Sequence, residues 1–504
     1  MSTREIILRT RKNILFNFNT QSVEDALNIY IKNVLGFNRG FEMSETAWQA
    51  LSNLATSKPI SVKLDLVNGL CKFSRDRIDE IIVGSSSYPT ITPNSLIYQV
   101  AENNEYAIVS GCTDSIDAAT SIIIESKYDG LPVSSIESGV FMDKKNLTTI
   151  EIPDSVINIG FRAFFGCSAL KKLTIPDAVV NISRQAFAET TIYNDETNWE
   201  NGVLYINNHL IAADSTQIGN SYVVKSGTRN ISEQAFKNCE TLEQITLPDG
   251  LISINKEAFD NCNKITEFII PNSVTSIGSM AVHNCKALTQ ITLPFIGSGA
   301  QLNSPEYTHI GWIFGAGSHI SNQYVLPSAL KSVTITAPCK QIGNNAFFSC
   351  SKLKNIIIPD SVTNIGDSAF ESCTGLTEIT IPASVISMGE NIFKNCTNLE
   401  TINFQGKPSY IATGLFSRCE NLTKFVVPSS VSTINAEAFY NCIYLTEITI
   451  PVSVTRIDKN AFRNCISLSA ITYLGTEEQW NNIEISSGND ALLEATKSFT
   501  TETN

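Results

Sequence analysis

The feature that most constrains the fold of this chain is a cysteine that recurs every 23 residues. Other apolar residues keep the same phase as this cysteine. The periodic cysteines form two runs, Cys239, Cys262 and Cys285, and then Cys350, Cys373, Cys396, Cys419, Cys442 and Cys465. A fixed period of this length is typical of proteins in which each repeat forms one coil of a solenoid. We therefore expect a stack of 23-residue coils.

The strand of one coil can be predicted from residues 359–381. Leu376, Ile379 and Ile381 form an L-x-x-I-x-I pattern, in which alternation turns both isoleucines to the inner side of a short strand. Pro382 begins the next unit and ends the strand, because proline has no N–H for the strand ladder. The pattern is that of a leucine-rich repeat.

The rest of a coil is predicted from the following unit. Val385 and Met388 mark a second short inward segment, and the stretch from Ile392 to Cys396 suits a single helical or 3-10 turn. Each coil is thus apolar inside and needs neighbours to bury that side. Twelve units start at residues 130, 153, 176, 225, 248, 271, 336, 359, 382, 405, 428 and 451, and a degenerate copy at 313–335 makes thirteen.

The periodic cysteines predict a structural ladder rather than disulfides. Successive coils place parallel Cβ vectors nearly 5 Å apart, whereas disulfides prefer Cβ atoms about 3.8 Å apart. The chain has no C-x-x-C pair, so structural zinc has little support. Thirteen cysteines, an odd number, fit folding in a reducing compartment. We expect buried core positions at Phe370, Cys373, Cys396, Cys419, Cys442 and Cys465, with the cysteines reduced.

Charge and hydropathy exclude several classes of partner. The formal net charge is −13, and phosphate binding needs clustered Lys and Arg, so we expect no nucleic-acid partner. We also expect no membrane insertion. The apolar run Ile6–Leu8 is too short for the core of a secretory signal. Synthesis in the cytosol without a secretory signal is therefore expected, with a final location on a virion surface or a cell surface.

The repeat has a recognisable consensus. Residues 358–379 read IPDSVTNIGDSAFESCTGLTEI, and this phrase recurs many times. It resembles the BspA-type leucine-rich repeat of bacterial, protist and phage-borne surface proteins over about residues 96–500. The flanks at 96–111 and 473–496 also resemble the leading and closing segments of that family. The resemblance implies adhesion or partner binding, and it carries no catalytic residues.

Residues 1–83 fall outside the repeat and predict a small α+β domain. A strand is expected at 3–8, amphipathic helices near 22–34 and 48–55, and an alternating strand from Ile60 to Leu66. The Gly, Ser and Pro content of residues 84–95 is typical of a linker. We expect residues 1–83 to attach the solenoid to a larger assembly or to mediate self-association.

The solenoid is expected to need a cap at each end. Residues 96–129 predict a β cap, residues 130–473 the solenoid, and residues 474–504 a second cap and tail. In the second cap, Thr476 and Gln479 form a T-x-x-Q capping box.

Two insertions interrupt the repeat. Residues 199–224 predict a hairpin with its turn at Asn207-Asn208. Residues 295–312 are Gly-rich and aromatic, and they continue into a polar segment that ends at Tyr324. The aromatic residues are either anchors for a partner or side chains that patch the stack where the period fails. The candidate partner-binding residues are Tyr307, Trp312, Phe314 and Tyr324.

Enzyme chemistry finds little support in the motifs. No P-loop, H-x-x-x-H or nucleophile motif is present, so no catalytic, cofactor-binding or metal-ligating residue is assigned. His309 and His319 with Cys339 match no zinc spacing, and we expect surface histidines there. The predicted function is recognition or adhesion, with a protein or glycan ligand on a cell surface. The alternative is a structural, self-assembling virion or scaffold component.

Overall fold

The computed structural model describes residues 4–10, 15–20, 60–62, 78–84, 96–113, 116–117, 119–299 and 308–500. The chain divides into two compact units, Met1–Asn198 and Trp199–Asn504. The helices predicted near 22–34 and 48–55, most of the predicted linker at 84–95, and Tyr307 lie outside the described residues.

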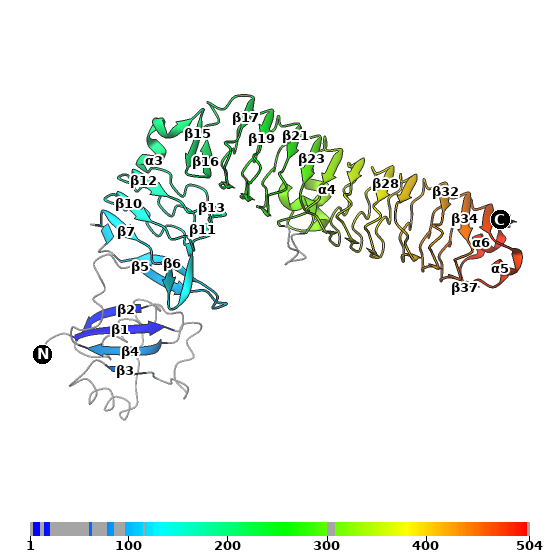
Figure 1. Cartoon of the computed structure of the whole chain (residues 1–504), viewed down its shortest axis with the longest axis horizontal. Coiled ribbons are helices and arrows are strands. Elements are labelled where there is room, and N and C mark those ends of the chain that lie inside the picture. Colours follow the sequence, from blue (N-terminus) through cyan, green and yellow to red (C-terminus); the bar gives the residue numbers. More distant parts are fainter. Residues whose placement is uncertain are drawn as a thin grey trace. The chain divides into compact units, whose positions relative to one another are not determined.

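The first unit begins with a four-stranded antiparallel sheet (Figure 1). Two of its strands lie where the sequence predicts them, at 3–8 and from Ile60. In sheet order the strands are β2 (Leu15–Thr20), β1 (Arg4–Thr10), β4 (Ile78–Gly84) and β3 (Ile60–Val62).

The coils of the first unit follow an antiparallel hairpin. This hairpin consists of β5 (Leu96–Val100) and β6 (Ala107–Cys112), and β6 pairs in parallel with β9 (Leu131–Ile136). The hairpin thus supplies the first strand that a parallel coil can stack on. The remaining elements are β7 (Ser121–Ile123), β8 (Lys127–Tyr128), β10 (Thr149–Glu151), β11 (Asn158–Ile159), β12 (Lys172–Thr174), β13 (Asn181–Ile182), α3 (Thr191–Asn194) and η2 (Glu196–Asn198).

The second unit has two series of parallel strands, one strand of each series in a regular coil. In the regular coils, the first series comes from the L-x-x-I-x-I pattern. It contains β17 (Ser221–Val223), β19 (Gln244–Thr246), β21 (Glu267–Ile269), β23 (Gln290–Leu293), β24 (Ser332–Ile335), β26 (Asn355–Ile357), β28 (Glu378–Ile381), β30 (Thr401–Phe404), β32 (Lys424–Val426), β34 (Glu447–Pro451), β36 (Ala470–Leu474) and β38 (Thr496–Phe499).

The strands of the second series are mostly two residues long, and the predicted hairpin lies near its start. β15 and β16 pair antiparallel, with Asn207 at φ 51° in the turn, and β16 then pairs in parallel with β18. The strands are β14 (Trp199–Glu200), β15 (Val203–Ile206), β16 (His209–Ala213), β18 (Asn230–Ile231), β20 (Ser253–Ile254), β22 (Ser276–Ile277), β25 (Gln341–Ile342), β27 (Asn364–Ile365), β29 (Ser387–Met388), β31 (Tyr410–Ile411), β33 (Thr433–Ile434), β35 (Arg456–Ile457) and β37 (Glu484–Ile485).

The third side of each coil is a set of hydrogen-bonded turns. The segment Ile392–Cys396 is predicted as helical or 3-10 but contains no helix. Asn391 (φ 56°) and Asn395 (φ 59°) have left-handed backbones, which interrupt a helical run. Asn tolerates this conformation better than most residues, which explains why Asn often precedes the periodic cysteine.

The core consists of ladders of identical residues. The rings of Phe347, Phe370 and Phe393 stack with centroids 5.3 and 5.5 Å apart, and all three are fully buried. The described part of the chain contains about 17 turns of ~23 residues, more than the thirteen predicted. The predicted fold class, a leucine-rich-repeat solenoid, is confirmed.

The far end of the second unit carries short helices. The predicted capping box is present in α5 (Glu477–Asn481), where Thr476 accepts from the Gln479 N–H and Gln479 accepts from the Thr476 N–H. Trp480 is 5% exposed and contacts the ring of Tyr473 edge-on at 5.4 Å. α6 (Asp490–Glu494) follows and buries Leu492.

Candidate functional site

The first series of strands presents two rows of side chains to solvent. In β28, Ile379 and Ile381 are buried, whereas Glu378 and Thr380 are exposed. Parallel pairing keeps this alternation in register, so Glu378 lies beside Thr401 and Thr380 beside Asn403. Each outward position therefore forms a row along the coils.

One of these rows carries no ionisable side chain, and we name it the uncharged row. Its members are mostly β-branched: Val223, Thr246, Ile269, Thr292, Thr334, Ile357, Thr380, Asn403, Val426, Thr449, Thr472 and Ser498. At about 4.8 Å per strand, the row extends for about 50 Å along the second unit.

Four aliphatic side chains of the uncharged row are well exposed. Val223 is 71% exposed, Ile269 53%, Ile357 49% and Val426 66%. They recur at every second or third coil, separated by Thr and Asn. Because β-branched side chains are stiff at χ1 and the strands are fixed by their ladders, little conformational entropy remains to be lost on binding. This surface is suited to burial against a partner.

The parallel row beside it is polar except for Ala470, and we name it the polar row. Its members are Ser221, Gln244, Glu267, Gln290, Ser332, Asn355, Glu378, Thr401, Lys424, Glu447, Ala470 and Thr496. Lys424 and Glu447 form an exposed ion pair at 2.8 Å, and this hydrogen bond raises the pKa of Lys424. The polar row thus gives the surface a mixed border of donors and acceptors.

Residues 308–325, at the end of the insertion and just after it, form the turn side of an irregular coil. Trp312 lies in η4 (Ile310–Phe314), is half-buried, and donates its indole N–H to the Ile277 carbonyl at 3.0 Å. Phe314 is fully buried, so its ring has no surface to offer a partner. Tyr324, in α4 (Asn322–Val325), is 78% exposed. Tyr307 lies outside the described residues.

A buried asparagine of α4, Asn322, connects α4 to the segment 309–311. Asn322 Oδ1 accepts from the Gly311 N–H at 3.1 Å and lies 2.8 Å from His309 Nδ1, while its amide donates to the Phe348 carbonyl. The expectation of a surface histidine at 309 is therefore wrong, because His309 contacts Asn322 and is 2% exposed. His319 packs edge-on against Phe348, with centroids 5.3 Å apart.

A charged cluster joins three coils near residues 237–283. Lys237 contacts both Glu257, at 2.7 Å, and Asp260, at 3.0 Å, and His283 Nδ1 lies 2.9 Å from Asp260. Burial alone would raise the pKa of Glu257, but hydrogen bonds from Lys237 and Gln234 outweigh it and lower the pKa to about 2. The pairing of these charges across coils indicates a structural role.

The predicted ladder cysteines lie in the core. All except Cys112 among the described cysteines are buried, and the buried ones form no disulfides. Among described residues, no group of three or more His, Cys, Asp and Glu side chains is arranged to hold a metal ion. No helix in the described ranges has the length and apolar character needed to cross a membrane.

The uncharged row was not identified from the sequence. The signal was available, since its members in the regular coils occupy the third x of the L-x-x-I-x-I pattern, between the two inward residues. Only the parallel register makes residues 23 positions apart into neighbours on one surface.

A family model described as BspA type leucine rich repeat region (6 copies) matches residues 134–218, 214–304, 318–446 and 409–487. Three similar solved structures illustrate the range of identity. A leucine rich cell surface protein from Faecalibacterium prausnitzii A2-165 is 26% identical, with 77% of this chain and 96% of that chain covered and a TM-score of 0.27. A leucine-rich repeat protein from Bacteroides ovatus ATCC 8483 is 21% identical, with coverages of 81% and 98% and a TM-score of 0.37.

The pneumococcal vaccine antigen PcpA is 15% identical, with coverages of 81% and 97% and a TM-score of 0.25. Among curated proteins, none matches this sequence. The family model covers well over half of the chain, and its repeats coincide with the coils described above. This protein therefore belongs to the BspA-type leucine-rich repeat family.

Proposed function

We propose that this protein is a non-enzymatic recognition or adhesion protein that binds a ligand on a cell surface. The observation that carries the proposal is the uncharged row of the second unit, with Val223, Ile269, Ile357 and Val426 exposed on a rigid sheet. Burying such side chains stabilises a complex by about 25 cal/mol per Å² of apolar surface. Membership in a family compatible with adhesion or binding supports the same conclusion.

A protein ligand fits this surface better than a glycan. Neither the uncharged row nor the polar row contains an aromatic side chain on which a sugar ring would stack. Aliphatic side chains spaced by Thr and Asn, beside a polar row, match the apolar centre and polar rim of protein interfaces. The partner is therefore a protein displayed on a cell surface or on a particle.

Two strand variants with the same charge change test the proposal. Ile357→Asp places a carboxylate in the uncharged row, and Asn355→Asp places one in the polar row of the same strand, β26. Fluorescently labelled protein is titrated onto intact cells, with protease-treated and glycosidase-treated cells in parallel. We expect Ile357→Asp to weaken binding at least about ten-fold, Asn355→Asp to have little effect, and protease treatment to remove the binding sites.

Equal binding by both variants would refute the assignment of the surface. Loss of binding after glycosidase treatment alone would identify a glycan ligand instead. A wild-type protein that binds no cells but forms large homo-oligomers by light scattering would favour the alternative, a self-assembling structural component of a virion or scaffold.

Residues 1–83 are proposed to attach the solenoid to a larger assembly. The support is that, in the described part of the chain, β1, β2, β3 and β4 form a sheet in which each strand pairs only with other members of the same sheet. Among the described residues, the coils use neither edge of this sheet, and this supports a role in assembly; a phage particle is one such assembly.

A further inference from the structure

The turn side of each interior coil is covered by the turn of the next coil. The Asn441 N–H donates to the Arg463 carbonyl at 2.9 Å, and the Asn464 amide donates to Asn441 Oδ1 at 2.8 Å. The Cys465 thiol donates to the Phe439 carbonyl at 3.1 Å. Similar contacts recur along the repeats. The exposed turn side of a coil is therefore complementary to a turn of the repeat itself.

The last coil, 451–473, is covered differently. The Asn460 N–H donates to the Ser487 carbonyl at 3.0 Å, and the Phe462 N–H donates to Asn489 Oδ1 at 2.9 Å. At the other margin the Thr496 N–H donates to the Ser469 carbonyl at 2.9 Å. The cap segment therefore replaces the next coil at the two margins of the turn and leaves its middle open.

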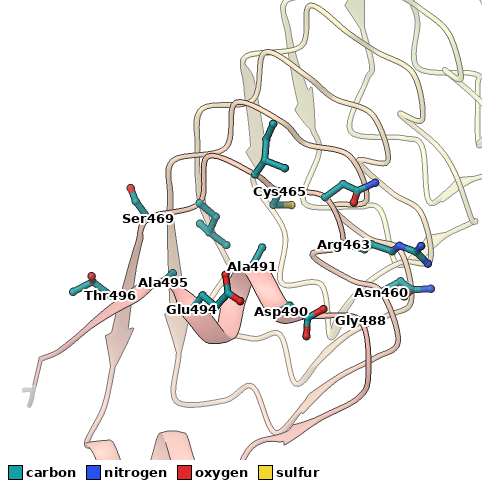
Figure 2. A pocket seen from close by; sticks show the side chains of 13 residues that line it. Asn460, Arg463, Cys465, Ser469, Gly488, Asp490, Ala491, Glu494, Ala495 and Thr496 are labelled. Atoms are coloured by element: carbon teal, nitrogen blue, oxygen red, sulfur yellow. The ribbon is translucent and has the colours of Figure 1, made fainter.

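A cavity of about 690 Å³ occupies the open middle, between residues 460–469 and α6 (Figure 2). Its volume lies within the range of ligand sites, about 300–1,000 Å³. Gly488, at φ 81°, lets the cap chain pass directly beside Asn460, because a Cβ there would clash with the Asn460 side-chain oxygen. This close passage fixes one wall of the cavity.

The chemistry of the walls specifies what fits. Within the described residues, the Asn464 N–H meets no acceptor, although the equivalent Asn441 N–H bonds to the next coil. Ile466 lines the cavity and is 78% exposed, so it offers apolar contact. Asp490 and Glu494 of α6 lie opposite Arg463, which gives the cavity one more carboxylate than cations.

We propose that this cavity binds a peptide segment of a partner protein, in the turn conformation of the repeat. A carbonyl of the segment accepts the Asn464 N–H, an apolar side chain packs on Ile466, and a basic side chain pairs with Glu494 or Asp490.

This inference goes beyond the proposed function, because the cavity lies on the turn side and at the cap, whereas the uncharged row lies on the strands. The uncharged row and the cavity share no residue. An experiment can therefore refute peptide binding by the cavity without refuting cell binding by the uncharged row, and the reverse.

The probe is a synthetic peptide with the sequence of residues 461–470, AFRNCISLSA, which forms the corresponding turn of the last coil. Its binding to the reduced full-length protein is measured by fluorescence anisotropy, with a scrambled peptide as the control. Glu494→Lys removes a carboxylate from the cavity, and Glu484→Lys makes the same charge change on β37, outside the cavity. Ala491→Trp fills the cavity.

We expect the peptide to bind and the scrambled peptide not to bind. Glu494→Lys should weaken binding at least about five-fold and Ala491→Trp at least about ten-fold, while Glu484→Lys and Ile357→Asp leave it unchanged. If Ala491→Trp melts at a lower temperature than wild type, its loss of binding is not specific to the cavity. The comparison of Glu494→Lys with Glu484→Lys then tests the proposal. Absence of binding, equal binding of the scrambled peptide, or equal effects of the two lysine variants would overturn the proposal.

Discussion

Most cysteines of the ladder donate a hydrogen bond to the neighbouring coil. The thiols of Cys396, Cys419 and Cys442 donate to phenylalanine carbonyls 26 residues earlier, at 3.1 to 3.2 Å. Valine would fill this space without donating. Cysteine thus satisfies a buried carbonyl oxygen and packs as a small apolar side chain, which accounts for its recurrence.

The ladder predicts that the protein loses stability at alkaline pH. Burial raises the pKa of Cys373 from 9.0 to about 12 and that of Cys465 to about 12. Below pH 9 both folded and unfolded thiols are protonated, so the stability is fully present. Above pH 9 the unfolded thiols ionise first, and each removes about 1.4 kcal/mol per pH unit until the folded pKa is reached. Urea unfolding at pH 8, 9 and 10, under reductant, measures this slope.

The matched variant is Cys373→Ala, whose unfolding free energy should fall less steeply with pH than that of wild type. A thiol reagent at neutral pH should modify the half-buried Cys112 before the buried described cysteines. Disulfides between successive ladder cysteines, found by mass spectrometry, would contradict the reduced ladder.

The charged cluster predicts a loss of stability in acid. The pKa of Glu257 is about 2, against 4.5 for an ordinary glutamate. Burial disfavours the charged carboxylate, but hydrogen bonds from Lys237 and Gln234 favour it more strongly. Its contribution, up to about 3 kcal/mol, is present above pH 4.5 and is lost as the pH falls toward 2. Urea unfolding of wild type and Glu257→Gln at pH 7 and pH 3 measures it.

We expect Glu257→Gln to be less stable than wild type at pH 7 and to approach wild type at pH 3. Glu243→Gln, an exposed change in the coil between Lys237 and Glu257, is the control and should have little effect at either pH. A constant difference between Glu257→Gln and wild type across this range would contradict the assignment.

At the scale of elements, the insertion shows how the stack continues where the period fails. The Met280 N–H donates to the Trp312 carbonyl and the Val282 N–H to the Ile313 carbonyl, while the Ile310 N–H donates to the Ala346 carbonyl. η4 therefore takes the place of a turn between two regular coils. Its exposed neighbours, Ile320 and Tyr324, are 58% and 78% exposed.

Separate measurements on two insertion variants distinguish patching from binding. Trp312→Ser removes a half-buried ring and its bond to the Ile277 carbonyl, and should lower the unfolding free energy by about 2–3 kcal/mol. Tyr324→Ser changes an exposed side chain and should alter stability by less than about 0.5 kcal/mol. Thermal unfolding and cell binding are measured on both. Reduced cell binding by Tyr324→Ser would make it a partner anchor, whereas unchanged binding would retire the binding role of this loop.

At the scale of the whole molecule, the two units share the same construction. In each, parallel strands of successive coils pair in register, as Ile150 with Leu173 and Ile448 with Ile471 do. Contacts between coils are therefore nearest-neighbour, and the ends need segments of different sequence. The β5–β6 hairpin and the α5–α6 segment meet this need.

Removal of residues 1–95 tests the attachment role. The 96–504 fragment begins at the β5–β6 hairpin, which already pairs with β9, so it should remain folded and monomeric and keep its cell binding. Full-length protein should multimerise or join a particle. Light scattering, circular dichroism and the cell assay on both proteins measure these properties. An insoluble fragment would show instead that the first residues bury an apolar coil face.

The sequence by itself determined the fold, the inward residues and the capping box. These follow from local spacing, because a 23-residue period and the alternation of Ile379 and Ile381 repeat in every coil. The turn conformation was mispredicted, since residues such as Asn391 and Asn395 adopt left-handed backbones that their spacing alone does not indicate. The hairpin at Asn207-Asn208 was predicted because its turn signal is also local.

Only the tertiary structure decided which outward residues form a surface. Ile357 and Val426 belong to one row because parallel register aligns residues that are distant in the chain. The burial of Phe314 and His309 depends on coils on either side of the insertion. The composition of the insertion predicted instead that both side chains are exposed. The cavity at the cap exists because Ser487, Asn489 and Thr496 meet the last coil at its margins alone, a consequence of contacts between segments rather than of any motif.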